Sequence, residues 1–164
     1  MTSLTTVNRD ARSGRRSDQL GAKRATSSGT QTRFALPVIL IVDDNEDNRD
    51  LFAMMLSRLG YEIELAIDGQ DGVERARAVR PSVILMDLAM PNMDGFEATR
   101  WIRAIPELAS VRIIAVTASY DTVSAQRARA AGCDEVLAKP CAPEDLTACV
   151  EAGLPASHRS RDAS

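Results

Sequence analysis

The stretch that decides the fold is LIVDDNED, Leu40 to Asp47, in which an uninterrupted apolar run ends in two adjacent aspartates. An apolar run without polar alternation is typical of a strand that is covered on both faces of its sheet. Adjacent carboxylates repel each other, so a pair at the end of a buried strand needs either a cation between its members or free access to solvent. Asp43 and Asp44 therefore mark the first position to examine for function.

The same alternation of short apolar runs and amphipathic stretches continues along the chain from Pro37. The runs predict strands at residues 38–42, 61–67, 82–87, 111–118 and 134–138. The stretches predict helices at residues 45–59, 69–80, 94–105, 121–132 and 143–150, most of them ended by glycine or proline. Five strands alternating with five helices predict an α/β protein with a doubly wound, five-stranded parallel sheet.

Composition narrows the class of protein. The 164 residues are 45% hydrophobic but only 4% aromatic, which predicts a globular domain with an aliphatic core. Without a secretory signal or a membrane-spanning apolar run, we expect a cytoplasmic protein that does not insert into membranes. Cys133, Cys141 and Cys149 are spaced eight apart, which fits neither a metal site nor a disulfide framework. The only histidine, His158, lies in a polar tail, which disfavours serine-histidine catalysis.

Three segments differ in composition. Residues 1–36 hold seven arginines and lysines against two aspartates, a net charge of +5, and lack apolar periodicity, so we expect a disordered basic extension. Such an extension either attracts an anionic surface or is simply solvated. Residues 37–154 form the predicted domain. Residues 155–164 are expected to be a disordered tail, too short for a DNA-binding or catalytic effector domain.

Polar residues stand where the predicted strands end. Asp43 and Asp44 follow the first strand, Asp87 the third, Thr117 the fourth and Lys139 the fifth. The carboxyl ends of parallel strands share one edge of the sheet, where ligands of such folds gather. Three carboxylates there favour Mg²⁺, and a lysine and a hydroxyl opposite them favour a phosphoryl group. Asp87 lies between the two and is the predicted nucleophile.

Four motifs, VDDNEDN, ILMDLAMPNMDG, IIAVTAS and VLAKP, occur in this order, and together they resemble the receiver domain of two-component response regulators, the CheY-like family. The resemblance covers residues 37 to about 153 and implies a flavodoxin-like (βα)5 fold. It also implies a stand-alone regulator in phosphorelay signal transduction, a phosphoprotein and not an enzyme in the usual sense. Its partners would be a sensor histidine kinase or a histidine phosphotransfer protein, and it would signal through protein contacts.

The resemblance implies roles for the residues at the strand ends. Asp87 would be the phosphoacceptor. Asp44, Asp87 and the backbone carbonyl of Ala89 would ligate Mg²⁺, with Asp43 acting through a bound water. Lys139 would pair with the phosphoryl oxygens.

Four further positions carry expectations from the same resemblance. Thr117 would move to hydrogen-bond the phosphoryl group, and Pro140 would follow a cis peptide bond. Gly95 would serve the turn into the third helix, where a residue without Cβ is tolerated in any backbone region. Val136 stands where family members commonly carry a tyrosine or phenylalanine that turns inward on phosphorylation, so this chain needs another route for its output.

Two other functions are compatible with parts of this sequence. A Mg²⁺-dependent phosphatase of the haloacid dehalogenase type also uses a strand-end aspartate, but its DxDxT setting is absent after the first strand. The second is a receiver-like interaction module that has the fold of the family but is never phosphorylated. Small side chains at Ala89 and Ser119 predict modest rather than very fast autodephosphorylation.

Overall fold

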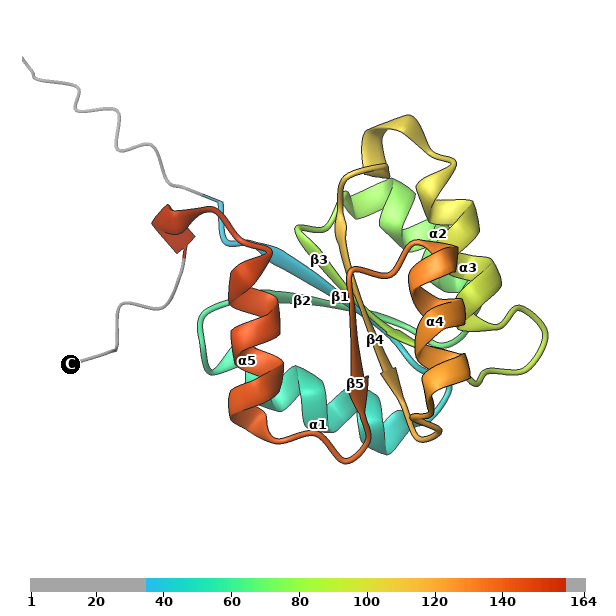
Figure 1. Ribbon diagram of the computed structural model, residues 1–164. Helices are drawn as coiled ribbons and strands as arrows, with labels where there is room; N and C mark the ends of the chain where they lie inside the picture. The colour runs from blue at the N-terminus through green and yellow to red at the C-terminus, as the bar shows by residue number, and fades with distance from the viewer. Residues whose placement is uncertain (1–34, 159–164) are drawn as a thin grey trace, which may run out of the picture. The chain divides into compact units, whose positions relative to one another are not determined.

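The computed structural model describes residues 35–158 and contains the doubly wound sheet expected from the sequence (Figure 1). The strands are β1 (Val38–Val42), β2 (Glu62–Ala66), β3 (Val83–Asp87), β4 (Arg112–Thr117) and β5 (Glu135–Ala138). The helices are α1 (Glu46–Ser57), α2 (Gly69–Val79), α3 (Gly95–Arg103), α4 (Thr122–Ala131) and α5 (Pro143–Ala152). Two short 3-10 helices are η1 (Pro106–Leu108) and η2 (Ala156–His158).

All strand pairs are parallel, and the strands lie in the order β2-β1-β3-β4-β5. The chain thus moves from β1 to one edge of the sheet and then returns past β1 to continue toward the other edge. The direction of winding reverses between β1 and β3, which is where ligands bind in open sheets of this kind. Asp43 and Asp44 follow β1 and Asp87 ends β3, so the carboxylates stand on both sides of this switch point.

Alternate residues of the central strands face two separate helical layers. Ile39 and Ile41 of β1 pack in the cluster that α1 and α5 cover, and Leu40 and Val42 pack in the cluster beneath α2, α3 and α4. Figure 1 shows the same division, with α1 and α5 on one face of the sheet and the other three helices on the opposite face. Burial on both faces explains why β1 and β3 are apolar throughout rather than alternating.

Short polar side chains begin four of the five helices. Each accepts a hydrogen bond from the backbone N–H three residues later, as N-cap residues do. These caps are Asn45, Asp68, Asp94 and Asp121. The fifth helix begins instead with Pro143 at its first position, as expected. Asp43, Asp44 and Asp87 cap no helix among the described residues, so the usual structural reason for a strand-end aspartate does not account for them.

The predicted ends of the elements differ slightly from the observed ones. The first helix ends at Ser57 instead of Leu59, because the backbone turns through Gly60, which has a φ of +84°. Past Leu154 the structure continues into η2, so the tail predicted from residue 155 misses this turn. The predicted basic extension falls almost entirely outside the described residues, as does the chain from residue 159. No helix in the described part is both long and apolar enough to cross a membrane.

Candidate functional site

Three carboxylates converge at the carboxyl ends of β1 and β3. One oxygen from each of Asp43, Asp44 and Asp87 lies within 4.8 Å of the other two. Asp43 and Asp87 are buried, whereas Asp44 is exposed. The cluster is thus partly enclosed by protein and partly open to solvent.

Lys139 closes the cluster from the end of β5. Its Nζ lies 2.6 Å from Oδ2 of Asp43 and 3.6 Å from Oδ1 of Asp87, and its side chain is only 15% exposed. Among residues 35–158, Lys139 is the one cationic side chain that forms ion pairs with any of the three carboxylates, so their negative charge is only partly compensated. The sequence predicted that these four residues lie at one edge of the sheet. It did not predict that Lys139 pairs more closely with Asp43 than with Asp87.

Asp43 is held in place by the start of α1. Its Oδ1 accepts hydrogen bonds from the backbone N–H of Asn45 at 2.9 Å and from Nδ2 of Asn48 at 3.4 Å. The Arg49 guanidinium donates to the backbone carbonyl of Asp43 at 2.8 Å. Sequence reasoning missed Asn48 and Arg49, although both stand one helical turn after the acidic pair. These contacts fix the Asp43 carboxylate, which in turn positions Lys139.

Asp87 is the last residue of β3 and is 7% exposed. Burial raises the pKa of its carboxyl above the ordinary value; the nearby charge of Lys139 lowers that pKa, and the charge of Asp43 raises it again. Its Oδ1 also accepts a hydrogen bond from the backbone N–H of Ala89 at 3.3 Å. The carboxylate therefore carries an unfavourable charge that a cation would relieve.

Thr117 and Pro140 line the β4 and β5 side of the rim. The Thr117 hydroxyl accepts a hydrogen bond from the backbone N–H of Ser119 at 3.2 Å, and its carbonyl accepts one from the backbone N–H of Lys139 at 2.8 Å. Within residues 35–158 the hydroxyl makes no hydrogen bond to a carboxylate of the cluster. The peptide bond between Lys139 and Pro140 is cis, which confirms that prediction.

The reason predicted for Gly95 is wrong, although the position matters. Gly95 is the first residue of α3 and does not have a positive φ, so backbone freedom is not what it provides. A Cβ at this position would lie 2.1 Å from the carbonyl oxygen of Asp87 and 2.8 Å from the Cα of Leu88. Glycine is needed because α3 packs directly on the backbone of the acidic residue. The left-handed conformation in this loop belongs to Asn92, with a φ of 67°.

Val136 lies away from the carboxylates, in the apolar cluster on the α3 and α4 side of the sheet. It is buried and pairs with Ala115 of β4. In the same layer the guanidinium of Arg127 on α4 stacks over the ring of Phe96 on α3, 4.4 Å from its centre. Sequence reasoning did not foresee this contact, which joins α4 to the helix that packs against Asp87.

The cluster fits a small hard cation. Its donors are carboxylate oxygens, the ligands that Mg²⁺ takes in proteins, and exposed Asp44 leaves room for the waters that Mg²⁺ retains. The carboxylates outnumber the ammonium group that pairs with them, so a divalent ion would relieve the remaining negative charge. The group contains only carboxylates and no histidine or cysteine, the side chains that zinc usually takes as ligands, so it favours Mg²⁺ over zinc.

Comparison with known proteins gives a consistent result. The family model of the response regulator receiver domain matches residues 39–151. The polar-differentiation response regulator DivK of Brucella anthropi is 37% identical over 102 residues, which are 62% of this chain and 83% of that protein.

Solved structures agree with this match. The chemotaxis protein CheY4 of Vibrio cholerae superposes with a TM-score of 0.70 at 32% identity, covering 73% of this chain and 100% of that one. The receiver domain of the Pseudomonas aeruginosa sensor histidine kinase PA1611 has a TM-score of 0.68 at 37% identity, covering 72% and 97%. That structure holds a magnesium ion coordinated in its active-site cleft.

Proposed function

The chain belongs to the response regulator receiver domain family of two-component systems, and we propose that it accepts a phosphoryl group on Asp87 within a phosphorelay. The observation that carries the proposal is the buried Asp87 carboxylate beside Asp43, Asp44 and Lys139 at the switch point of the sheet. Receiver domains are signalling domains, and the family is not one of conventional enzymes. The predicted domain at residues 37–154 contains the whole family match.

The proposed step uses few groups from the protein. A carboxylate oxygen of Asp87 attacks the phosphorus of a phosphohistidine on the donor, and an O–P bond forms as the N–P bond breaks. The imidazole nitrogen keeps the electron pair of the broken bond. Lys139, 3.6 Å from Asp87, is placed to pair with the phosphoryl oxygens, and Thr117 is the proposed hydroxyl donor to them. Alignment and charge neutralisation are the main requirements of phosphoryl transfer, so this chain needs no histidine of its own.

Mg²⁺ is the proposed cofactor, and it would neutralise the charge that gathers on the transferred phosphoryl group. The proposed ligands are Asp44, Asp87 and the backbone carbonyl of Ala89, with Asp43 acting through a water. Ala89 is exposed, which leaves that part of the rim open to the incoming group. The magnesium in the similar receiver domain from Pseudomonas aeruginosa supports this assignment.

The proposed docking surface for the kinase or histidine phosphotransfer protein is the outer face of α1. Leu51 and Met54 are about half exposed there. A pocket of about 260 Å³ lies between this face and the residues after β5, and its lining includes Leu51, Met55, Lys139 and Cys141. A partner seated on this apolar surface would place its phosphohistidine beside Asp87.

The output of the domain is proposed to run through the segment between β4 and α4. Val136 supplies no ring that could turn inward, so the usual coupling to Thr117 has to be replaced. Tyr120 and Val123, in and just after this segment, are both more than half exposed, as suits a surface that a downstream protein reads. Movement of Thr117 toward the phosphoryl group would shift this segment directly.

Incubation with acetyl phosphate and Mg²⁺, followed by intact mass measurement, tests the proposal. The wild type should gain one phosphoryl group, and Asp87→Asn should gain none. The matched control is Asp50→Asn, an exposed residue of α1, which should label like the wild type. Absence of label on the wild type would favour a non-phosphorylated interaction module, and multiple turnovers of a small phosphomonoester would favour a phosphatase.

A further inference from the structure

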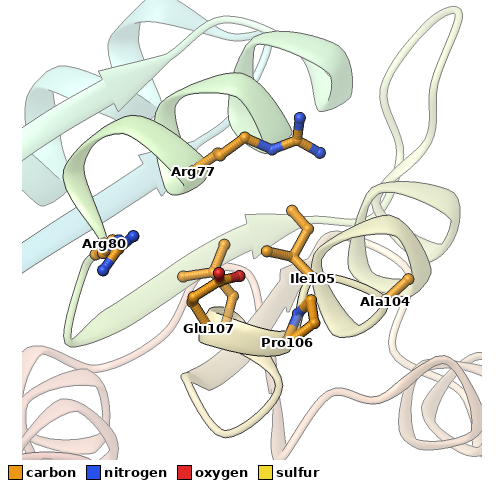
Figure 2. A pocket seen from close by; sticks show the side chains of 7 residues that line it. Arg77, Arg80, Ala104, Ile105, Pro106 and Glu107 are labelled. Atoms are coloured by element: carbon orange, nitrogen blue, oxygen red, sulfur yellow. The ribbon is translucent and has the colours of Figure 1, made fainter.

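A second hollow lies between the carboxyl ends of α2 and α3, with a volume of about 330 Å³. Figure 2 shows Arg77 of α2 and Arg80, the residue that follows this helix, on one side, and Ile105, Pro106 and Glu107 across from them. We call this hollow the α2–α3 groove. A neighbouring hollow of about 320 Å³ shares Ala104 with it and is lined by Arg100 and Trp101 of α3. The two hollows meet at Ala104 and are considered together as one surface.

This surface lies apart from the Asp87 site. Arg80 precedes β3, whereas Asp87 is the last residue of that strand. The length of β3 places the groove about 13 Å away along the sheet, at about 3.3 Å per residue. An occupant of the groove would therefore not contact Asp87.

The arginines of this surface lack acidic partners of their own. Arg77, Arg80 and Arg100 make no ion pair within residues 35–158. By contrast, Arg75 on the same helix pairs with Glu64 and Asp71. The unpaired guanidinium groups are free to bind carboxylates from outside the domain.

Apolar side chains stand directly beside these charges. Trp101 is the only tryptophan of the chain and is 55% exposed. Ile105 and Pro106 form the apolar wall opposite Arg77. Exposed aromatic rings next to arginines are the side chains that most often anchor protein partners.

The backbone at Arg80 adds an independent observation. Arg80 ends α2 in the left-handed conformation, with φ 49° and ψ 65°. Glycine usually takes this position, as Gly132 does at the end of α4 with a φ of 117°. An arginine there costs local stability, because a residue with a Cβ is strained in this conformation, and strained residues cluster at functional sites. Its side chain lines the groove.

We propose that the α2–α3 groove binds an acidic segment of a partner protein, with a carboxylate against Arg77 and Arg80 and an apolar side chain against Ile105 and Trp101. A protein segment fits better than a nucleic acid, because Glu97 and Glu107 line the same surface and would repel a polyphosphate backbone. Three arginines and two glutamates leave the surface a local charge of only +1, which one carboxylate of a partner would balance.

Selection of a displayed library of random short peptides on the full-length protein tests this proposal. Enriched peptides should combine glutamate or aspartate with a large apolar residue. Their binding should shift the fluorescence of Trp101 to shorter wavelength. Arg77→Glu should weaken binding by about tenfold or more. Arg58→Glu, at the end of α1, is the matched control and should bind like the wild type.

Arg80→Gly separates a binding role from a structural one. The variant should weaken peptide binding while its melting temperature stays equal or rises, since glycine is relaxed in this conformation. Labelling by acetyl phosphate should be unchanged in Arg77→Glu and Arg80→Gly. A failure of the peptide-binding proposal is therefore distinguishable from a failure of the proposal that Asp87 is phosphorylated. A single-stranded oligonucleotide serves as the second probe of Trp101 emission. The proposal is overturned if no acidic peptide is enriched, if both variants bind the peptides as the wild type does, or if the oligonucleotide shifts the Trp101 emission and the peptides do not.

Discussion

Replacing Asp87 by asparagine should make the protein more stable in the absence of Mg²⁺. Asparagine keeps the shape of the side chain and can still accept the hydrogen bond from Ala89, so the change removes mainly the charge. At an effective dielectric constant of about 20, Lys139 at 3.6 Å attracts that charge by about 4.6 kcal/mol. Asp43, at no more than 4.8 Å, repels it by at least about 3.5 kcal/mol.

These two interactions nearly cancel, and Asp44 adds a smaller repulsion that solvent screens. The cost of burying the carboxylate then decides the sign, since the effective penalty for a buried ion is several kcal/mol. We expect Asp87→Asn to raise the free energy of unfolding by about 1 to 2 kcal/mol at neutral pH. Urea denaturation with and without millimolar Mg²⁺ measures this, with Asp50→Asn as the control for net charge.

The pH dependence follows from the raised pKa of Asp87. Below pH 3.8, the ordinary pKa of an aspartate carboxyl, Asp87 is protonated in both the folded and the unfolded chain. The wild type and Asp87→Asn should therefore be equally stable there. As the pH rises, the unfolded chain ionises first, and the wild type loses stability relative to the variant until the folded-state pKa is passed. Added Mg²⁺ should narrow the gap, because an ion bound to the folded state stabilises it. A variant that is less stable than the wild type at neutral pH without Mg²⁺, or a gap independent of pH, would refute the reasoning.

Three further outcomes are expected. Gly95→Ala should lower the free energy of unfolding by about 3 kcal/mol in urea denaturation, because the new Cβ would collide with the main-chain oxygen of Asp87. The control is Gly60→Ala, whose Cβ would meet no atom within 4 Å. This variant should lose less free energy of unfolding, chiefly through backbone strain. Arg103→Ala should lower the free energy of unfolding by about 2 to 4 kcal/mol in the same measurement, because its guanidinium donates to the carbonyl of Gly132 at 2.8 Å and to two carbonyls, of Ala109 and Val111, in the loop before β4; a loss under 1 kcal/mol would contradict this. Burial raises the pKa of the Cys133 thiol, so it should react with a disulfide reagent at pH 8 only after unfolding; rapid labelling of the native protein would be evidence against this.

The strand ends were the most predictable part of the molecule. Apolar runs in a parallel sheet are continuous because both faces are buried, so β1, β3 and β4 could be identified within about a residue from the sequence. Their shared direction then gathers Asp43, Asp87 and Lys139 on one edge. The chemistry of the rim follows from topology, which is why a few motifs in the right order were enough.

Contacts between elements distant in the sequence could not be predicted in the same way. The role of Gly95 depends on how closely α3 approaches β3, which no local pattern encodes. Arg103 binds the backbone of loops as far along the chain as Gly132, and Arg127 stacks over Phe96 across two helices. Ionic and aromatic contacts of this kind depend on the packing distance between layers, which the hydrophobic pattern alone does not determine.

The central claim is that Asp87 itself carries the phosphoryl group. Borohydride reduces an aspartyl phosphate to homoserine, so reduction after treatment with acetyl phosphate and Mg²⁺, followed by peptide mass mapping, locates the modified residue. We predict homoserine at position 87 alone, and only when Mg²⁺ is present. The yield of homoserine should be strongly reduced or zero in Lys139→Ala. Homoserine at Asp43 or Asp44, or none at any position while the protein remains folded, would contradict the account.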